Sequence, residues 1–380
     1  MEKILCITND FGPRAGGIET FVIGLIERLP HGSVIVYTSA QDASQEYDRT
    51  WLEEYGVEVL RDKAKILLPT PGVSFCVNSL VRDRQIKTVF FGAAAPLGLL
   101  SKGLRKAGVQ RIVALTHGHE VWWSRIWPFT QAMKAIAAQV DHLTYLGDFT
   151  QRAISKAISP EAASAMVKIA PGIDTDHFAP VDASQLRDQL GVSGKKVIVS
   201  VGRLVHRKGQ DTLIEAMPEI LSQIPTAHIV MIGEGPYRAY LENRVKALNV
   251  QGAVTFIGRI QYAELPRYIC TGDIFVMPSR SRLAGLEVEG LGIVYLEASA
   301  CGLPVIAGDS GGAPDAVLAG KTGLVVDGRS SSEVAKAVIE LLNDEQRCTE
   351  MGAQGRQWII KEWRWDIWAT AFAHLLKVDR

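Results

Sequence analysis

The stretch KILCITNDFGPRAGGIETFVIGLIERL, residues 3–29, decides the fold class of this chain. Its first six residues, Lys3–Thr8, form a short apolar run that ends at a polar turn, a pattern typical of a buried β-strand. Beyond the glycines, apolar residues recur at the spacing of one helix face: Ile18, Phe21, Val22, Leu25, Ile26 and Leu29. The stretch therefore predicts a strand, a glycine-containing loop and a helix, the opening unit of a parallel α/β sheet.

The same alternation of apolar runs and helical stretches continues along the whole chain. Such runs, apolar throughout, are typical of parallel strands covered on both faces. We expect strands at 3–8, 33–38, 87–92, 111–115 and 141–145, then at 196–201, 228–232, 254–257, 273–277, 304–307 and 323–326. Because the pattern restarts near residue 196, we expect two doubly wound, Rossmann-like α/β domains, residues 1–171 and 172–360, with a cleft between them.

The last part of the chain carries an aromatic cluster. Residues 362–368, EWRWDIW, open an amphipathic helix that bears three tryptophans. Burying so much aromatic surface requires a partner, and we expect residues 361–380 to pack back on the first domain.

Composition excludes several classes of protein. The 380 residues suggest two or three domains, and 41 basic residues against 41 acidic ones give no basic field for nucleic acid. Five cysteines without CxxC spacing argue against a disulfide framework or a zinc ribbon and favour a reducing compartment. The chain begins directly with a strand-like run and has no long apolar segment, so we expect neither a signal peptide nor a membrane span.

The first glycine loop, Asn9–Ile18, could bind an anion. Gly16 and Gly17 would let the backbone approach a ligand at the start of a helix, although a simple tight turn explains them equally well. The loop is not GxGxxG, and the second strand ends in Thr38-Ser39 without the acidic residue of a nicotinamide site. A dehydrogenase is therefore disfavoured.

His117, His119 and Glu120 follow the fourth expected strand, at the edge where open α/β sheets bind ligands. They could face a ligand, form a structural pair or ligate a metal, but the sequence offers no clear third metal ligand.

A second glycine loop, Gly202–Gly209, concentrates positive charge. Arg203, Arg207 and Lys208 beside a helix start suit a diphosphate, and a solvated basic turn is the alternative.

Two glutamates lie eight residues apart in the stretch GLEVEGLGIVYLE, residues 285–297. Glu289 and Glu297 flank glycines whose amides lie just ahead of a helix, which suits hydroxyl groups of a sugar or ribose. A helix start with favourable acidic residues is the alternative.

Residues 63–119 carry an excess of basic side chains against a single acid, Asp83: Lys63, Lys65, Arg82, Arg84, Lys87, Lys102, Arg105, Lys106 and Arg111. Such a face could bind anionic lipid headgroups or could simply be solvated. The aromatic cluster Trp122, Trp123, Trp127 and Phe129 could lie at a membrane interface or pack internally.

Taken together, Glu289-x7-Glu297, the 202–209 loop and Gly16-Gly17 resemble the retaining GT-B glycosyltransferases of family 4, across almost the whole chain. Within that family the chain is most similar to the actinobacterial GDP-mannose-dependent phosphatidylinositol monomannoside mannosyltransferases, through stretches such as 116–120, 207–211 and 288–298. The resemblance implies two Rossmann-like domains, a donor cleft and a C-terminal helix that crosses back to the first domain.

The resemblance also implies residue roles. The residues nearest the chemistry would be His117, Glu289, Arg203 and Lys208. Donor contacts would come from Gly16, Gly17, Arg203, Lys208, Arg259, Ile260, Glu289, Gly290, Leu291, Gly292, Ile293, Val294 and Glu297. Acceptor contacts would come from Asn9, Asp10, Arg14 and His119. No cofactor or essential metal is implied, because the fixed cations neutralise the diphosphate. One departure stands out: Arg282-Leu283-Ala284-Gly285 replaces a loop that is usually glycine-rich in the family.

The resemblance implies an α-mannosyltransferase that uses GDP-mannose and a phosphatidylinositol mannoside-type glycolipid. It would work in the cytoplasm, bound peripherally to the inner face of the membrane through residues 63–119. The alternatives are a family 4 enzyme with another nucleotide sugar of the UDP-glucose type, a GT-B-fold nucleotide-sugar epimerase, and a non-catalytic membrane-binding module. The sequence does not indicate the oligomeric state.

Overall fold

The computed structural model describes residues 2–14 and 16–378. Met1, Ala15 and residues 379–380 lie outside this range; they belong to the expected chain start, first glycine loop and final helix. The chain divides into two compact units, and each is described by itself. Unit 1 comprises Met1–Gly172 and Trp365–Arg380, and unit 2 comprises Ile173–Arg364. The expected boundaries were 171/172 and 360/361.

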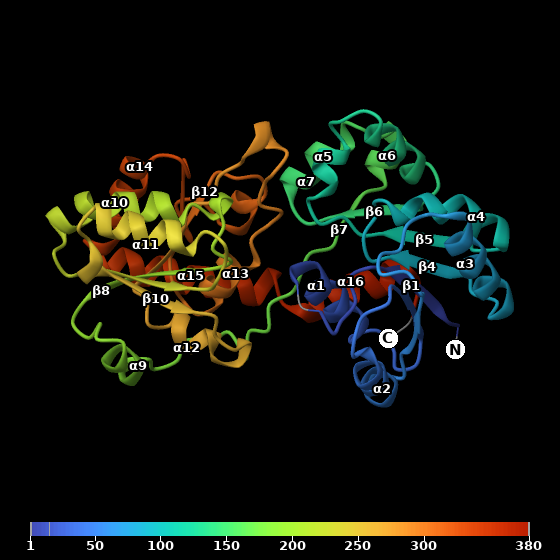
Figure 1. Cartoon of the computed structure of the whole chain (residues 1–380), viewed down its shortest axis with the longest axis horizontal. Coiled ribbons are helices and arrows are strands. Elements are labelled where there is room, and N and C mark those ends of the chain that lie inside the picture. Colours follow the sequence, from blue (N-terminus) through green and yellow to red (C-terminus); the bar gives the residue numbers. More distant parts are fainter. Residues whose placement is uncertain (1, 15, 379–380) are drawn as a thin grey trace. The chain divides into compact units, whose positions relative to one another are not determined.

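Unit 1 is a seven-stranded parallel sheet with helices on both faces (Figure 1). The strand order is β3-β2-β1-β4-β5-β6-β7. The strands are β1 (Ile4–Thr8), β2 (Val34–Thr38), β3 (Glu58–Arg61), β4 (Thr88–Phe91), β5 (Arg111–Ala114), β6 (His142–Tyr145) and β7 (Val167–Lys168). The helices are α1 (Gly17–Ile26), α2 (Ser44–Tyr55), α3 (Pro71–Asp83), η1 (Leu97–Leu100), α4 (Ser101–Ala107), α5 (Glu120–Trp123), α6 (Phe129–Ala137), α7 (Asp148–Ser155), α8 (Pro160–Ser164) and α16 (Trp365–Leu376).

Unit 2 is a six-stranded parallel sheet of order β10-β9-β8-β11-β12-β13. Its strands are β8 (Lys196–Val201), β9 (Ala227–Ile232), β10 (Val254–Gly258), β11 (Ile274–Met277), β12 (Val305–Gly308) and β13 (Gly323–Val326). Its helices are α9 (Ser184–Gln189), η2 (His206–Lys208), α10 (Gln210–Gln223), α11 (Arg238–Ala247), η3 (Gln251–Ala253), η4 (Tyr262–Glu264), α12 (Leu265–Ile269), η5 (Leu283–Gly285), α13 (Ile293–Ala300), η6 (Ala313–Ala316), α14 (Ser331–Leu342) and α15 (Glu345–Glu362).

The predicted doubly wound α/β class is confirmed, because both sheets are parallel and each strand order reverses at a central strand. All eleven expected strands are present within a residue or two of their expected bounds. Two further strands, β3 and β7, were not predicted. The first is a half-buried edge strand with charged ends, Glu58 and Arg61, and the second has only two residues, so neither produces a continuous apolar run.

The aromatic tail does not pack as one piece. Trp365 begins α16 and packs in unit 1 against Gly24 and Phe21 of α1, and Phe372 of the same helix contacts Phe90. Trp363, in contrast, is buried in unit 2, edge-to-face with Trp358 at 5.5 Å. The expectation that all three tryptophans pack on the first domain is therefore wrong for Trp363.

Each sheet has a position at which its strand order reverses. In unit 1, β1 lies between β2 and β4, and in unit 2, β8 lies between β9 and β11. Open α/β sheets bind ligands at the carboxyl ends of such strands. The loops that follow β1 and β8 are the two glycine loops of the sequence.

Candidate functional site

The loop after β8 brings a lysine into the interior of unit 2. Lys208 is only 8% exposed, although lysine side chains are seldom buried without a partner. The loop turns into α10 at Gly209, where φ is +72° and a Cβ atom would lie 1.9 Å from the Pro278 carbonyl oxygen. Only glycine fits this close approach. The 202–209 loop is therefore held against the loop that follows β11.

That second loop supplies the partner of Lys208. Oε2 of Glu289 lies 2.8 Å from Lys208 Nζ and 2.8 Å from an Arg207 guanidinium nitrogen. The Glu289 backbone N–H donates to Ser310 Oγ, which follows β12. Loops after three strands thus converge on one buried carboxylate.

The charge balance decides the protonation state of Glu289. Burial opposes its ionisation, but Lys208 and Arg207 outweigh this effect and hold the pKa of the carboxyl below its ordinary range. The cluster is therefore an ionised carboxylate between two cations. No hydrogen bond to Glu289 Oε1 is found in the described residues, so this oxygen can accept one from a ligand hydroxyl.

Glu297 lies on α13 and is also buried. Burial raises its pKa from the ordinary 4.5 to about 7, and the nearby Lys208 only partly opposes the shift. The pKa values of the two acids that interact with Lys208 are therefore shifted in opposite directions.

The pKa of Glu297 predicts how stability depends on pH. Because the folded-state pKa is raised, the folded protein must ionise a buried acid as pH rises from about 4.5 through about 7, and stability falls over this window. Glu297→Gln removes this penalty. We expect the wild type to lose roughly 3 kcal/mol relative to the variant between about pH 5 and about pH 8.

Urea unfolding of both proteins without nucleotide, at the two pH values, checks this expectation. Equal losses of unfolding free energy in wild type and variant would show that Glu297 ionises as readily in the folded chain as in the unfolded chain.

The start of α13 supplies unpaired amides. The helix begins at Ile293 after Gly292, and no side chain of the described residues caps its first N–H groups. Gly292 has φ +79°, which favours glycine. The predicted donor residues Leu291 and Val294 are buried, and Gly290 and Ile293 are half-buried. A helix start with free N–H groups beside Lys208 and Arg207 is suited to phosphate oxygens.

The other predicted donor residues of unit 2 lie at the same edge of the sheet. Arg203 follows β8, and its exposed guanidinium has no ion-pair partner within the described part of the chain. Arg259 and Ile260 follow β10, exposed and half-buried respectively.

A second buried cluster supports the loop and was not predicted. Arg280 contacts Asp211 Oδ2 at 2.6 Å and Thr212 Oγ1 at 2.8 Å, and its backbone N–H donates to the Arg207 carbonyl at 2.8 Å. Burial, reinforced by the Arg280 charge, lowers the pKa of His206. Arg280 thus ties the loop after β11 to the start of α10. The only signal in the sequence is one more arginine after a predicted strand.

The loop that departs from the family pattern has an unusual backbone. Leu283 and Ala284 both adopt left-handed φ values, +50° and +53°. Such values cost a residue with a Cβ atom roughly 1 kcal/mol or more. Glycine would adopt these φ values without that cost, and the Leu283 side chain is exposed.

In unit 1, His117 is held in one tautomer. Its Nε2 lies 2.5 Å from the Gly92 carbonyl oxygen, which can only accept, so Nε2 carries the proton. Burial lowers the His117 pKa and favours the neutral ring. The His117 backbone N–H donates to Oε2 of the fully buried Glu120, whose Oε1 lies 3.2 Å from His119 Nε2. The Thr116–Glu120 stretch is thus a connected polar group.

The loop after β1 places the predicted acceptor residues close together. Arg14 pairs with Glu19 at 2.8 Å and lies 3.9 Å from Asp10. Burial, followed by the Glu19 charge, raises the Asp10 pKa to about 6. The Asn9 side chain is already occupied, because its amide both donates to and accepts from the Leu67 backbone. Asn9 therefore holds the loop in place.

The two predicted glycines begin α1. A Cβ atom at Gly16 would meet the Glu19 carboxylate at 2.2 Å, whereas one at Gly17 would meet nothing within 4 Å. Gly17 thus borders open space. Among the described residues, no three His, Cys, Asp or Glu side chains gather in a way that could hold a metal ion.

Comparison with known proteins defines the class. The family model "Glycosyl transferases group 1" matches residues 182–358, the part of the chain that carries Lys208, Glu289 and Glu297. HepE from Anabaena, solved with UDP, shares the fold with a TM-score of 0.82 at 20% identity, covering 99% of both chains. A sucrose-phosphate synthase from Thermosynechococcus elongatus gives 0.79 at 22%, covering 99% of this chain and 98% of the other. The fold is that of the GT-B glycosyltransferases.

Full-length relatives narrow the class. The chain is 42% identical to the GDP-mannose-dependent alpha-(1-6)-phosphatidylinositol monomannoside mannosyltransferase of Mycobacterium tuberculosis, covering 100% of this chain and 99% of the relative. It is 40% identical to the enzyme of Corynebacterium glutamicum named for the monoacylated form of that acceptor, covering 99% and 98%. The chain belongs to this family of mannosyltransferases.

Proposed function

We propose that this chain transfers α-mannose from GDP-mannose to a phosphatidylinositol mannoside-type glycolipid, with retention of the α configuration. The observation that carries the proposal is the group of buried Lys208 and Glu289 with half-buried Arg207, in the same unit as the start of α13, which no side chain of the described residues caps. Fixed cations and free amides suit a diphosphate, and the carboxylate suits sugar hydroxyls. The full-length relationship to enzymes named for this donor and acceptor supports the choice of substrates.

In this mechanism the residues of unit 2 act on the leaving group. Negative charge develops on the diphosphate oxygens as the bond to the sugar breaks, and prepositioned cations stabilise that charge best where water is excluded. Lys208 meets this requirement because it is buried and already oriented by Glu289. Because the same contacts engage Oε2 of Glu289, we assign Glu289 to sugar hydroxyls and not to covalent attack. The acceptor hydroxyl then attacks from the side on which the diphosphate leaves, and a phosphate oxygen takes its proton.

The test is a panel of nucleotide sugars offered with a phosphatidylinositol mannoside extract and followed by mass spectrometry. We expect a mannosylated lipid with GDP-mannose and no product with UDP-glucose. Transfer of a hexose from UDP-glucose would show that GDP-mannose is not the donor. Conversion of GDP-mannose alone to another nucleotide sugar would indicate an epimerase.

We further propose that transfer needs no metal ion, because Lys208 and Arg207 supply the positive charge that a divalent cation provides elsewhere. Turnover after exhaustive chelation with EDTA should stay within about a factor of two of the untreated value. Activity that disappears with EDTA and returns with Mg²⁺ would contradict this.

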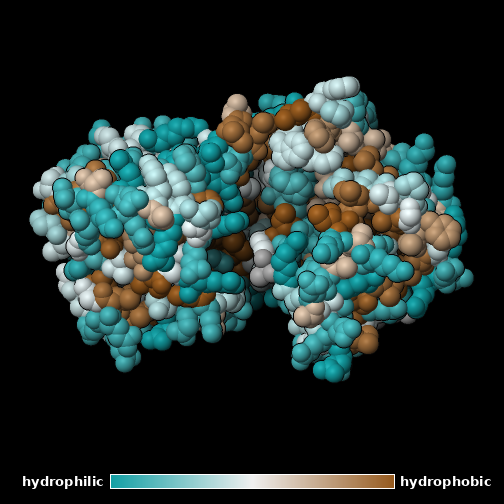
Figure 2. All heavy atoms as spheres, viewed as in Figure 1, coloured by the Kyte–Doolittle hydropathy of each residue, from teal (hydrophilic) through white to brown (hydrophobic). Residues whose placement is uncertain are grey.

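Unit 1 has exposed apolar and basic side chains that are suited to contact with lipid. Ile66 and Leu68 are 65% and 51% exposed and follow the exposed Lys63 and Lys65 in the sequence, and Phe75 of α3 is 72% exposed. Figure 2 shows apolar side chains among hydrophilic ones on the visible face of this unit. Three arginines of the basic stretch 63–119 already have partners within the protein: Arg84 pairs with Glu58, Arg105 pairs with Asp141, and Arg111 donates to the Leu375 carbonyl. Within the described residues no helix is long and apolar enough to cross a bilayer.

We propose that this surface binds the anionic inner leaflet of the cell membrane from the cytoplasmic side. Each basic residue near such a surface contributes about 1 kcal/mol, so the double variant Lys63→Glu/Lys65→Glu should bind anionic vesicles at least about tenfold more weakly. Co-sedimentation with phosphatidylglycerol vesicles measures this. The matched control is Lys246→Glu/Lys336→Glu on exposed positions of unit 2. Equal affinity of the two double variants would place the membrane contact elsewhere.

A further inference from the structure

Arg280 places a positive charge in the interior of unit 2, at the edge of the sheet that carries Lys208. It is only 8% exposed. Its guanidinium lies 2.6 Å from Asp211 Oδ2, 2.8 Å from Thr212 Oγ1 and 3.0 Å from His206 Nδ1. Asp211 and Thr212 lie in the first turn of α10, and His206 is the first residue of η2. One buried side chain therefore bridges η2 and the helix that follows it.

η2 carries both cations that we assign to the diphosphate, Arg207 and Lys208. It is a 3-10 turn of three residues, and such turns have poorer hydrogen-bond geometry than α-helices. The Lys208 N–H donates to the Val205 carbonyl at 3.0 Å, and the Gly209 N–H donates to the His206 carbonyl at the long distance of 3.4 Å. Contacts from outside the turn are therefore needed to hold the two cations in place.

Arg280 supplies such contacts on both sides of the cations. Its guanidinium contacts His206, which precedes Arg207, and Asp211, which follows Lys208. Its backbone N–H donates to the Arg207 carbonyl at 2.8 Å. A change of the Arg280 side chain leaves this backbone bond in place, so it loosens η2 without removing the contact between the two loops.

The partners of Arg280 are themselves anchored to other loops at the same edge. Asp211 Oδ2 also accepts a hydrogen bond from the Tyr237 hydroxyl, after β9, at 3.0 Å. Thr212 Oγ1 donates to the Gly328 carbonyl, after β13, at 2.9 Å. Because the Asp211 carboxylate offsets the Arg280 charge, the pair adds little net charge to the edge. Its contribution is to fix the positions of its neighbours.

We propose that Arg280 is a positioning residue for sugar transfer and acts through the two cations of η2. The inference rests on the proposed function, since it requires the donor diphosphate to bind at these cations. With the Arg280 side chain in place, Arg207 and Lys208 are oriented before the donor arrives. Without it, η2 shifts and the cations approach the leaving group less closely. A displacement of about 1 Å can cost about a hundredfold in rate.

The test measures turnover and GDP affinity of Arg280→Met and of the wild type, with the nucleotide sugar that the wild type uses. Calorimetric stoichiometry with GDP counts the folded molecules, and turnover is expressed per GDP-binding molecule. We expect turnover to fall at least about tenfold and GDP affinity less than about threefold, because the cations matter most as charge develops on the leaving group. Asp211→Asn should reproduce this split, and Arg280→Lys should recover part of the lost turnover.

A double variant identifies the residue through which Arg280 acts. In a Lys208→Met background, Arg280→Met should lower turnover by no more than about threefold, because a cation that it positions is already absent. Two independent losses would multiply instead.

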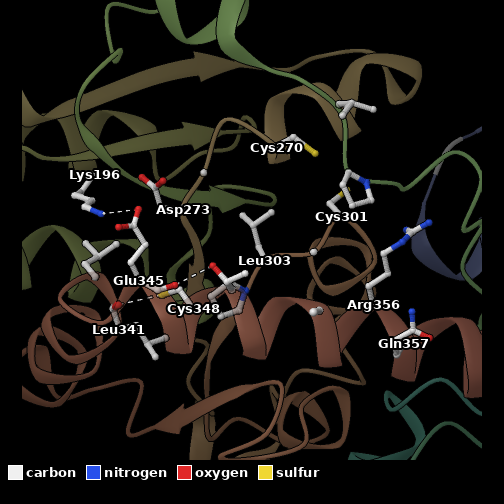
Figure 3. A pocket seen from close by; sticks show the side chains of 18 residues that line it. Lys196, Cys270, Asp273, Cys301, Leu303, Leu341, Glu345, Cys348, Arg356 and Gln357 are labelled. Atoms are coloured by element: carbon white, nitrogen blue, oxygen red, sulfur yellow. Dashed lines mark hydrogen bonds and ion pairs between the residues drawn. The ribbon is translucent and has the colours of Figure 1, made fainter.

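The matched control is an arginine at the opposite edge of the same sheet. Arg187 of α9 donates to the Thr271 carbonyl at 3.1 Å and to the Lys195 carbonyl at 2.6 Å, and it lies 3.5 Å from Asp273. Asp273 precedes β11, and it lines a cavity of about 570 Å³ together with Lys196, the first residue of β8 (Figure 3). This edge is formed by the amino ends of the strands. Arg187→Met therefore removes similar contacts far from η2 and should retain wild-type turnover.

Two results would overturn the proposal: turnover of Arg280→Met within about threefold of Arg187→Met, or losses that multiply in the double variant. If Arg280→Met does not fold, as judged by circular dichroism, Asp211→Asn and Arg280→Lys decide by the same comparisons. Failure of the proposed function is a separate result, because the wild type itself would then transfer no mannose from GDP-mannose. Failure of the present inference leaves that activity, and its loss in Lys208→Met, intact.

Discussion

Replacing Lys208 with methionine is expected to lower the turnover of mannosyl transfer by at least about a hundredfold. Methionine keeps much of the length of the side chain but removes the buried ammonium, which lies 2.8 Å from Glu289. The developing charge on the diphosphate then loses a fixed cation in a region that little water enters. Steady-state rates with GDP-mannose, together with calorimetric affinities for GDP, measure the effect.

The control for this variant is Lys246→Met, the same change on an exposed residue of α11. It should retain wild-type turnover. If Lys208→Met folds and turns over within about threefold of the control, the assignment of Lys208 to the diphosphate is wrong.

The second large effect is expected for Glu289→Gln. The amide cannot supply the negative charge that Lys208 and Arg207 contact, and its altered donor pattern disturbs the sugar hydroxyls. Transfer and donor hydrolysis should both fall by about a hundredfold. GDP, however, should bind at least as tightly as before, because one negative charge is removed beside two cations.

This split between binding and turnover distinguishes a role in sugar recognition from a purely structural one. A structural role predicts that GDP affinity falls together with turnover, since breaking a buried ion pair disturbs the loops that form the site. Glu340→Gln is the matched control, because Glu340 of α14 is exposed to solvent and pairs with Arg347 of α15. It should change neither quantity.

The predictable part of the fold is the part that burial determines. Strands covered on both faces are mostly apolar, so runs such as Val197–Val199 within β8 are visible in the sequence. β3 escaped prediction because an edge strand with one open side tolerates Glu58 and Arg61. The sequence also did not predict that Trp363 and Trp365 lie in different units. Periodicity indicates that Trp363 is buried, but it does not indicate which unit buries it.

The site was predictable where loop position and residue type suffice. Lys208, Glu289 and Glu297 follow strands that end at one edge, so their proximity could be inferred from topology. The contact of Arg207 with Glu289, 82 residues along the chain, depends on the direction of two side chains.

The donor diphosphate is proposed to bind at Lys208 and Arg207 of unit 2. The most direct measurement is a crystal structure of the chain with GDP-mannose. We predict phosphate oxygens within hydrogen-bonding distance of Lys208 Nζ and of the first amides of α13, with mannose hydroxyls on Glu289. A well-ordered donor whose phosphates touch neither Lys208 nor the start of α13 would contradict the account.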